Sequence, residues 1–236
     1  MSDVESVIKK PGSARVVISE RPKVDAPISI TSKVLEMQQL SIEGVQAVSP
    51  LSKEISQASQ RQNIGVHLSE LAFLGHLVLR GNSENKQFSA AIETVLGVPL
   101  PSALQSETKN DLSISWISPD EWLVILPITG AFEIERRLRI MVDGHCAVVN
   151  VSGGQTVLSL SGTNALQVLH KSTPYDVHER NFPVGKVVTT VFAKAQVIIR
   201  RTGPESWELT VRRSFADYVW QWLMDASTEY GVEVSA

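Results

Sequence analysis

The chain has 236 residues, and 43% of them are apolar, which is enough to bury a sizeable core in one or two domains. Its formal net charge of −3 argues against a nucleic-acid-binding protein, whose surface would be basic. A single cysteine, Cys146, excludes an internal disulfide, and no secretory leader or run of roughly 20 apolar residues is evident. We therefore expect a soluble, cytoplasmic protein that binds neither nucleic acid nor membrane.

Residues 1–60 differ from the rest of the chain. They contain no Phe, Trp or Tyr, and their seven basic residues balance their seven acidic residues. Without aromatic anchors, such a segment buries little apolar surface to offset the entropy of ordering. We predict a flexible or partner-wrapping N-terminal tail over 1–60. Its more apolar stretch, 28–51, either orders against a partner or stays solvated.

Residues 61–236 have the pattern of a globular α+β domain made of two similar halves, about 64–152 and 153–231. In the first half, apolar periodicity predicts strands at 76–81, 112–117, 122–126 and 146–151, with helices at 82–96 and 129–142. The order β-α-β-β-α-β is that of a split, ferredoxin-like unit.

The second half nearly repeats this order. Its predicted strands are 155–161, 187–192, 196–201 and 207–212, and its predicted helices run from 162 to 170 and from 214 to 226. A loop over 172–185 separates the first helix from the strands that follow. We therefore predict two ferredoxin-like βαββαβ-type units whose antiparallel sheets pack on each other.

No set of residues has the local spacing of a catalytic or metal site. The histidines lack the HExxH pattern, and Ser152-Gly153-Gly154 lacks the glycine spacing of a phosphate-binding loop. Asp120 and Glu121 adjoin each other on a predicted turn, where carboxylates are normally solvated rather than tuned for acid–base catalysis. We predict no catalytic residue, no cofactor-binding residue and no metal ligand in this chain, although a site assembled from distant residues stays open.

Adjacent arginines occur at 136–137, 200–201 and 212–213, and the last two pairs lie at strand ends near the C-terminal helix. Arginine suits interface ion pairs and carboxylate recognition. We predict that partner-docking residues are to be found among Arg200, Arg201, Arg212 and Arg213. Contact with an anionic ligand and protection of a strand edge are the alternatives.

Several short strings, in the right order, resemble the gamma subunits of heterotetrameric sarcosine oxidase. Ser118–Leu123 (SPDEWL) is similar to the family's GPDEWL stretch, and Val149–Ser152 (VNVS) is similar to its VDVS strand. Pro174–His178 (PYDVH) resembles the PLDLH segment. Asn150 stands where the family usually has Asp. The resemblance covers about residues 64–231.

This resemblance implies a fold like the folate-binding domain of aminomethyltransferases and a non-catalytic gamma subunit in a complex with alpha, beta and delta subunits. In that family the alpha and beta chains carry FAD, FMN, NAD and the tetrahydrofolate site, and the delta chain holds zinc. The complex oxidatively demethylates sarcosine and transfers the one-carbon unit to tetrahydrofolate. The alternatives are the corresponding subunit of N-methylglutamate dehydrogenase, a stand-alone folate-binding protein, and a regulatory module that uses the apolar part of the tail.

Overall fold

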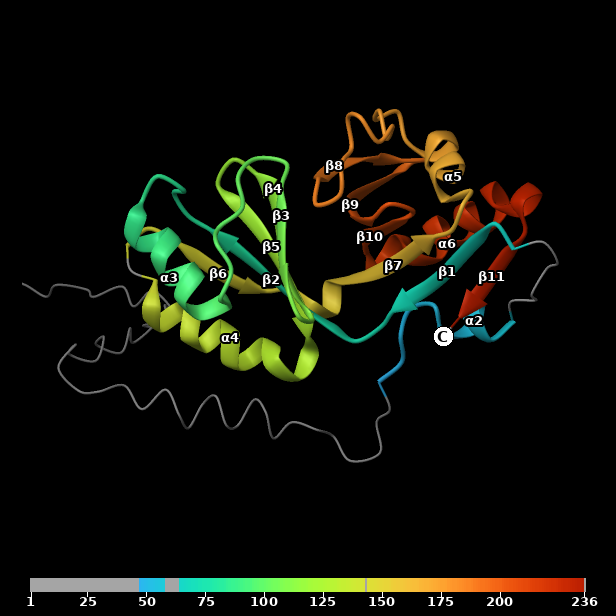
Figure 1. The fold of residues 1–236 in the computed structure, drawn as a ribbon. Helices are drawn as coiled ribbons and strands as arrows, with labels where there is room; N and C mark the ends of the chain where they lie inside the picture. The colour runs from blue at the N-terminus through green and yellow to red at the C-terminus, as the bar shows by residue number, and fades with distance from the viewer. Residues whose placement is uncertain (1–46, 58–63, 143, 236) are drawn as a thin grey trace, which may run out of the picture. The chain divides into compact units, whose positions relative to one another are not determined.

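The computed structural model describes residues 47–57, 64–142 and 144–235 (Figure 1). The tail prediction for residues 1–46 and 58–60 lies outside the described residues. Residues 47–57, which the sequence analysis assigned to the same tail, include the short helix α2 (Ser52–Gln57). Leu51, directly before α2, is fully buried in the core of the domain.

The first sheet has five strands in the order β3-β4-β5-β2-β6, and every neighbouring pair is antiparallel. Its strands are β2 (Leu74–Arg80), β3 (Ser106–Lys109), β4 (Leu112–Ser118), β5 (Glu121–Pro127) and β6 (Ala147–Asn150), and its helices are α3 (Lys86–Leu96) and α4 (Ile128–Met141). Without the short edge strand β3, this is the strand order of a ferredoxin-like unit.

The second sheet repeats this plan with one addition. Its order is β11-β1-β7-β10-β9-β8. The strands are β1 (Val66–Leu71), β7 (Gln155–Ser161), β8 (Val187–Phe192), β9 (Ala195–Gly203), β10 (Ser206–Arg212) and β11 (Val232–Ser235), and the helices are α5 (Ala165–Ser172) and α6 (Ala216–Ala226). Without β1, the order matches that of the first sheet, so the predicted α+β fold is confirmed.

β1 precedes the whole first unit in sequence, yet it lies between β11 and β7. It is parallel to β11 and antiparallel to β7.

Glycine allows β1 to enter the second sheet beside the turn that follows β7. Gly162 has φ +115°, and a Cβ added there would lie 2.5 Å from the carbonyl oxygen of Gly65. That same carbonyl accepts a hydrogen bond from the backbone N–H of Asn164 at 2.9 Å, and the N–H of Gly162 donates to the carbonyl of Glu205 at 3.0 Å. The turn therefore needs a residue without a side chain at position 162.

Local signals in the sequence explain where the helices begin and end. The Asn85 side chain caps α3 by accepting from the backbone N–H groups of Gln87 and Phe88, and Gly97 ends the helix in the left-handed conformation. The buried side of α3 consists of Phe88, Ala91, Ile92, Val95 and Leu96, as its apolar periodicity predicts.

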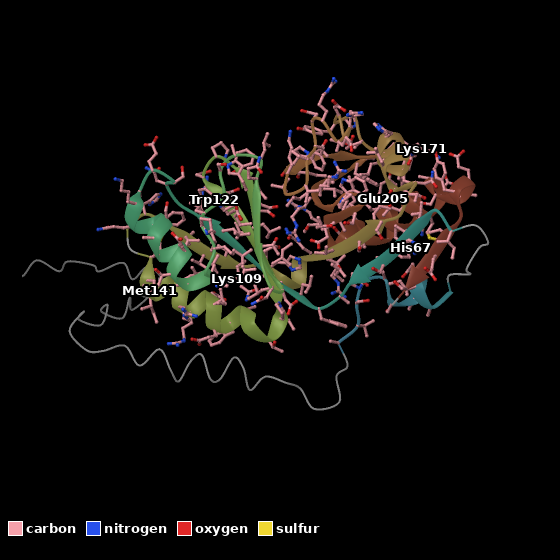
Figure 2. All side chains as sticks on the ribbon, viewed as in Figure 1. His67, Lys109, Trp122, Met141, Lys171 and Glu205 are labelled. Carbon is pink, nitrogen blue, oxygen red and sulfur yellow. The ribbon has the colours of Figure 1, made fainter. Side chains whose placement is uncertain are left out.

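Each sheet buries a core of its own beneath its helices. Side chains such as Leu77, Ile114 and Trp122 fill the first core, and Leu158 and Trp207 belong to the second. Figure 2 labels Trp122 in the first unit. A smaller cluster, Leu123, Ile125 and Val157 with partly buried neighbours such as Val78 and Ile198, joins the other faces of the two sheets. The two predicted sheets thus pack against each other through an apolar contact.

No helix among the described residues is long and apolar enough to cross a membrane.

Candidate functional site

The predicted docking arginines lie in very different surroundings. Arg200, on β9, faces Glu208 directly across the hairpin with β10. Its guanidinium forms an ion pair with Glu208 at 2.6 Å and donates to the Thr108 hydroxyl of β3 at 2.8 Å. The Arg200 side chain is only 12% exposed. Through these two bonds its guanidinium connects the β9–β10 hairpin of the second sheet to β3, the edge strand of the first.

Arg201 points to the opposite face of β9, as the alternation of side chains along a strand requires. It is buried, and its guanidinium donates to the carbonyls of Phe182 (2.8 Å), Gly203 (3.1 Å) and Pro204 (2.5 Å). It also lies over the Trp207 ring, 5.3 Å from the centroid. Arg201 therefore holds the loop before β8 and the β9–β10 turn in place, and it has no surface to offer a partner.

Arg212 and Arg213 are both exposed, at the end of β10 and in the 3-10 turn η2 (Arg213–Phe215). Arg213 donates to the carbonyl of Val48 at 3.0 Å. Among the described residues, Arg212 has no side-chain hydrogen bond or ion pair. These two side chains are the members of the predicted set that stay available to another molecule, and their docking role stays a prediction.

A cleft of about 610 Å³ opens where the two sheets meet, and Arg200 lies in its wall. Its apolar lining includes Leu71, Leu74 and Leu112, and its charged lining is Asp111, Arg200, Arg201 and Glu208. Because Glu208 and the backbone carbonyls occupy the two guanidinium groups, the described residues of the cleft present no free cation for an anionic ligand. Neither Glu208 nor Thr108 was predicted from the sequence. A regular hairpin with its turn at 202–205 would place Trp207 opposite Arg200, and only the register irregularity between Ser206 and Trp207 brings Glu208 to that position.

A second cavity, of about 620 Å³, adjoins the β4–β5 hairpin, which carries Trp116 and Trp122. Trp122 is buried, and its indole N–H donates to the Pro101 carbonyl at 3.0 Å. Trp116 is its cross-strand partner and lines the cavity with it. The turn carboxylates are half-exposed, and both form ion pairs with Arg80. Asp120 accepts from Arg80 at 3.0 Å, and this raises the pKa of the Arg80 guanidinium.

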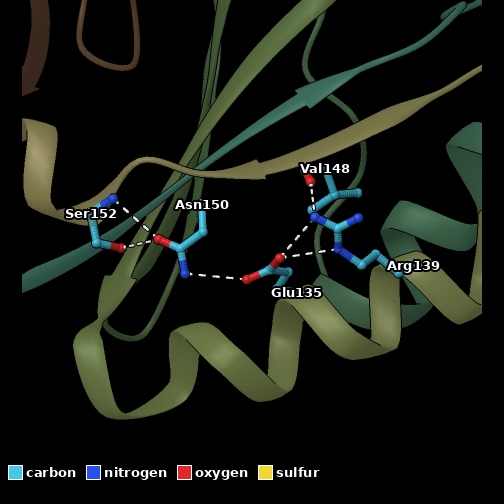
Figure 3. A network of polar contacts seen from close by, with 5 residues as sticks. All are labelled: Glu135, Arg139, Val148, Asn150 and Ser152. Atoms are coloured by element: carbon cyan, nitrogen blue, oxygen red, sulfur yellow. Dashed lines mark hydrogen bonds and ion pairs between the residues drawn. The ribbon is translucent and has the colours of Figure 1, made fainter. Parts of the chain in front are cut away.

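Asn150, the residue that departs from the family's Asp, lies in a polar network between β6 and α4 (Figure 3). Its amide N–H donates to Glu135 at 3.2 Å, and its amide oxygen accepts from the Ser152 hydroxyl at 2.6 Å. Arg139 donates both to Glu135 (3.0 Å) and to the Val148 carbonyl (2.6 Å). The arginine therefore covers part of the backbone of the edge strand β6.

We expect Asn150→Asp to lower the free energy of unfolding by about 1 kcal/mol at pH 7, because it places a second carboxylate beside Glu135. Arg139 is close enough to offset part of the repulsion. Urea unfolding of the single variant and of Asn150→Asp combined with Glu135→Gln measures the coupling. If Asn150→Asp costs as much stability in the Glu135→Gln background as it does in the wild type, repulsion by Glu135 is not the cause of the loss.

His76 is a buried histidine that the sequence did not distinguish from the other histidines. It is 1% exposed, on the β2 face that meets the second sheet, and its backbone N–H donates to the Ser152 hydroxyl at 3.0 Å. Within the described part of the chain, neither ring nitrogen has a hydrogen bond of good geometry. Burial lowers the pKa of His76 to about 4, and the nearby Leu74 carbonyl offsets only part of this effect.

This histidine should make the fold sensitive to acid. Because the unfolded imidazole takes up its proton near pH 6.5 and the folded one only near 4, stability should fall as the pH drops between these values. The lowered pKa of His76 corresponds to a loss of about 3 kcal/mol in the free energy of unfolding by pH 4. Denaturant unfolding of wild type and His76→Leu, measured from pH 7.5 to pH 4.5, separates the pH dependence caused by His76 from that caused by the carboxylates. Parallel curves for the two proteins would contradict it.

Cys146 and His178 lie in different parts of the fold. Cys146 is half-buried beside the first core, and the described residues contain no cluster of three or more His, Cys, Asp or Glu side chains that could hold a metal ion. His178 lies in the loop before β8, where its Nδ1 accepts from the backbone N–H of Arg180 at 3.2 Å.

Comparison with known proteins gives one consistent answer. The model of the sarcosine oxidase gamma subunit family matches residues 80–229. Sarcosine oxidase subunit gamma from Corynebacterium sp. (strain P-1) is 34% identical over 169 residues, which are 71% of this chain and 83% of that protein.

Solved structures agree with the sequence comparison. Heterotetrameric sarcosine oxidase from Corynebacterium sp. U-96, in complex with pyrrole 2-carboxylate, contains a chain with a TM-score of 0.71 and 31% identity, and the match covers 80% of this chain and 99% of that chain. The glycine cleavage system aminomethyltransferase T from Bartonella henselae has a TM-score of 0.56 and 15% identity over 73% of this chain and 48% of that chain, which shows a shared fold. The chain belongs to the sarcosine oxidase gamma subunit family.

Proposed function

We propose that this chain is the non-catalytic gamma subunit of a heterotetrameric sarcosine oxidase. The observation that carries the proposal is the match to almost the whole of one chain in a solved heterotetrameric sarcosine oxidase, at 31% identity and a TM-score of 0.71. In this role the chain assembles with alpha, beta and delta subunits in the cytoplasm. It contributes binding surface to an enzyme that oxidatively demethylates sarcosine and transfers the one-carbon unit to tetrahydrofolate.

In the proposed assembly, FAD, FMN, NAD, zinc and tetrahydrofolate bind to the partner subunits. The interior of this chain supports a scaffold role, because Arg200 and Arg201 are used to hold its loops and its two sheets together. The exposed arginines at the end of β10 support a docking role.

Native affinity purification of the tagged full-length chain tests this proposal. We expect larger chains to co-purify, with a flavin absorption band and sarcosine oxidation that forms 5,10-methylenetetrahydrofolate when tetrahydrofolate is supplied. A colourless chain that purifies alone would contradict the proposal, and titration with tetrahydrofolate would then test the stand-alone folate-binding alternative. A flavoprotein complex that oxidises N-methylglutamate but not sarcosine would assign the chain to the related dehydrogenase.

A further inference from the structure

Exposed aromatic rings and exposed arginines occur together where β10 passes into α6. Phe215 is 44% exposed and Tyr218 is 36% exposed, and they are three residues apart at the start of the helix. Arg212 and Arg213 precede Phe215 with Ser214 between them, and Arg213 donates to the carbonyl of Val48, whose side chain is also exposed. We call the two arginines, the two aromatic residues and Val48 the β10–α6 surface.

A short stretch of exposed backbone lies next to this surface among the described residues. The 3-10 turn η1 (Ser152–Gly154) lies against η2. Gly153 and Gly154 are exposed, and a Cβ added to either would meet no atom of the described residues within 4 Å. A partner could therefore approach the backbone of η1 closely while it contacts the side chains of the β10–α6 surface.

The arginines of this surface are not balanced by carboxylates among the described residues. Arg213 bonds to a neutral carbonyl, and Arg212 has no ion pair within the described ranges. Glu208, four residues before Arg212, is paired with Arg200, and Asp217, four residues after Arg213, accepts from the Gln221 side chain along α6 at 2.8 Å. Residues 1–46, which lead into Val48, contain six acidic and six basic residues, so this segment has no excess negative charge with which to complement the arginines.

We propose that the β10–α6 surface docks an acidic segment of another subunit of the oxidase, an inference that rests on the proposed function. Tyrosine, phenylalanine and arginine are enriched at the centres of protein interfaces, where they contribute much of the binding energy. A guanidinium group can bind a carboxylate through two parallel hydrogen bonds. The two arginines select the acidic partner, and the aromatic rings supply the apolar contact.

Charge reversal tests this assignment in the intact complex. The tagged full-length chain is expressed in its native host, from which the chromosomal gene for this chain has been deleted. The flavin absorbance per purified chain is then measured. We expect Arg212→Glu combined with Arg213→Glu to lower this value at least tenfold, and added salt to weaken the wild-type complex. Arg137→Glu is the matched control, because Arg137 is an exposed α4 arginine without an ion pair in the described structure. The control should retain the wild-type value.

The outcomes separate the two proposals. If the wild-type chain brings down flavoprotein and the double variant brings down as much, the docking assignment is wrong and the proposed function stands. If the wild-type chain brings down none, the proposed function fails first. Phe215→Ala leaves both arginines in place. It should lower the flavin content about fivefold without changing the melting temperature of the free chain. An unchanged flavin content would show that the aromatic rings do not contribute to docking.

Cross-linking identifies the occupant directly. A benzoylphenylalanine introduced in place of Tyr218 should cross-link to a peptide of another subunit that is rich in Asp and Glu. Cross-linking to residues 1–46 of the same chain, or to a partner peptide without acidic residues, would overturn the proposal.

Discussion

Arg201→Ala is expected to lower the free energy of unfolding by about 3 to 4 kcal/mol, which is among the largest losses that a single substitution causes. The substitution leaves the carbonyls of Phe182, Gly203 and Pro204 without their shared donor, and the bond to the Phe182 carbonyl is a buried one. It also removes the guanidinium from the face of Trp207. Urea unfolding followed by tryptophan fluorescence measures the change.

Arg212→Ala is the matched control, since it removes the same side chain from an exposed position on the neighbouring strand. Its free energy of unfolding should stay within about 0.5 kcal/mol of wild type. Arg201→Lys should recover only a small part of the loss, because one ammonium group cannot reach three carbonyls in the geometry of a guanidinium. Equal stability of Arg201→Ala and Arg212→Ala would contradict the structural role of Arg201.

Gly162→Ala should destabilise the protein by about 3 kcal/mol for two reasons that add. Its φ of +115° is strained for any residue with a side chain, and the new Cβ would meet the Gly65 carbonyl oxygen at 2.5 Å. Since this oxygen belongs to the backbone that leads into β1, it cannot move without disturbing the sheet. Gly153→Ala, in the open turn η1, has no such contact and should change stability by less than about 0.5 kcal/mol.

Thermal unfolding of both glycine variants provides the measurement. A hydrogen-exchange experiment then locates the effect, because weakened protection in Gly162→Ala should appear first in β1 and in the residues of β11 that pair with it. Loss of protection confined to the first sheet would contradict this explanation.

Much of the fold could be predicted because apolar periodicity is strong in the central elements. The strand predicted at 155–161 and the strand predicted at 187–192 match the observed bounds of β7 and β8. β3 was missed because its sequence, SETK, is polar and mostly exposed at a sheet edge. The start of the last helix was placed at 214, whereas a 3-10 turn occupies 213–215 and α6 begins at Ala216 without a side-chain cap.

Long-range relations could not be predicted from local patterns. The sequence of β1, VHLSEL, has the alternation of a strand, but nothing local indicates that it pairs with a strand from the end of the chain. The arginine prediction failed to separate Arg201 from its neighbours for a similar reason. Alternation along β9 places Arg200 and Arg201 on opposite faces, but only the fold shows that one face is packed against the loop from Phe182.

The position of β1 also has a consequence for the order in which the chain can fold as it is synthesised. The first unit uses a continuous stretch of sequence, so its sheet can form from neighbouring segments. β1 is made before that unit, but His67 pairs with Glu233, which is 166 residues later. Contacts between such distant residues form slowly, because a long loop must close first. The second sheet therefore stays incomplete until the residues of β11 have left the ribosome, and loss of this four-residue strand would leave β1 as an unprotected edge open to other chains.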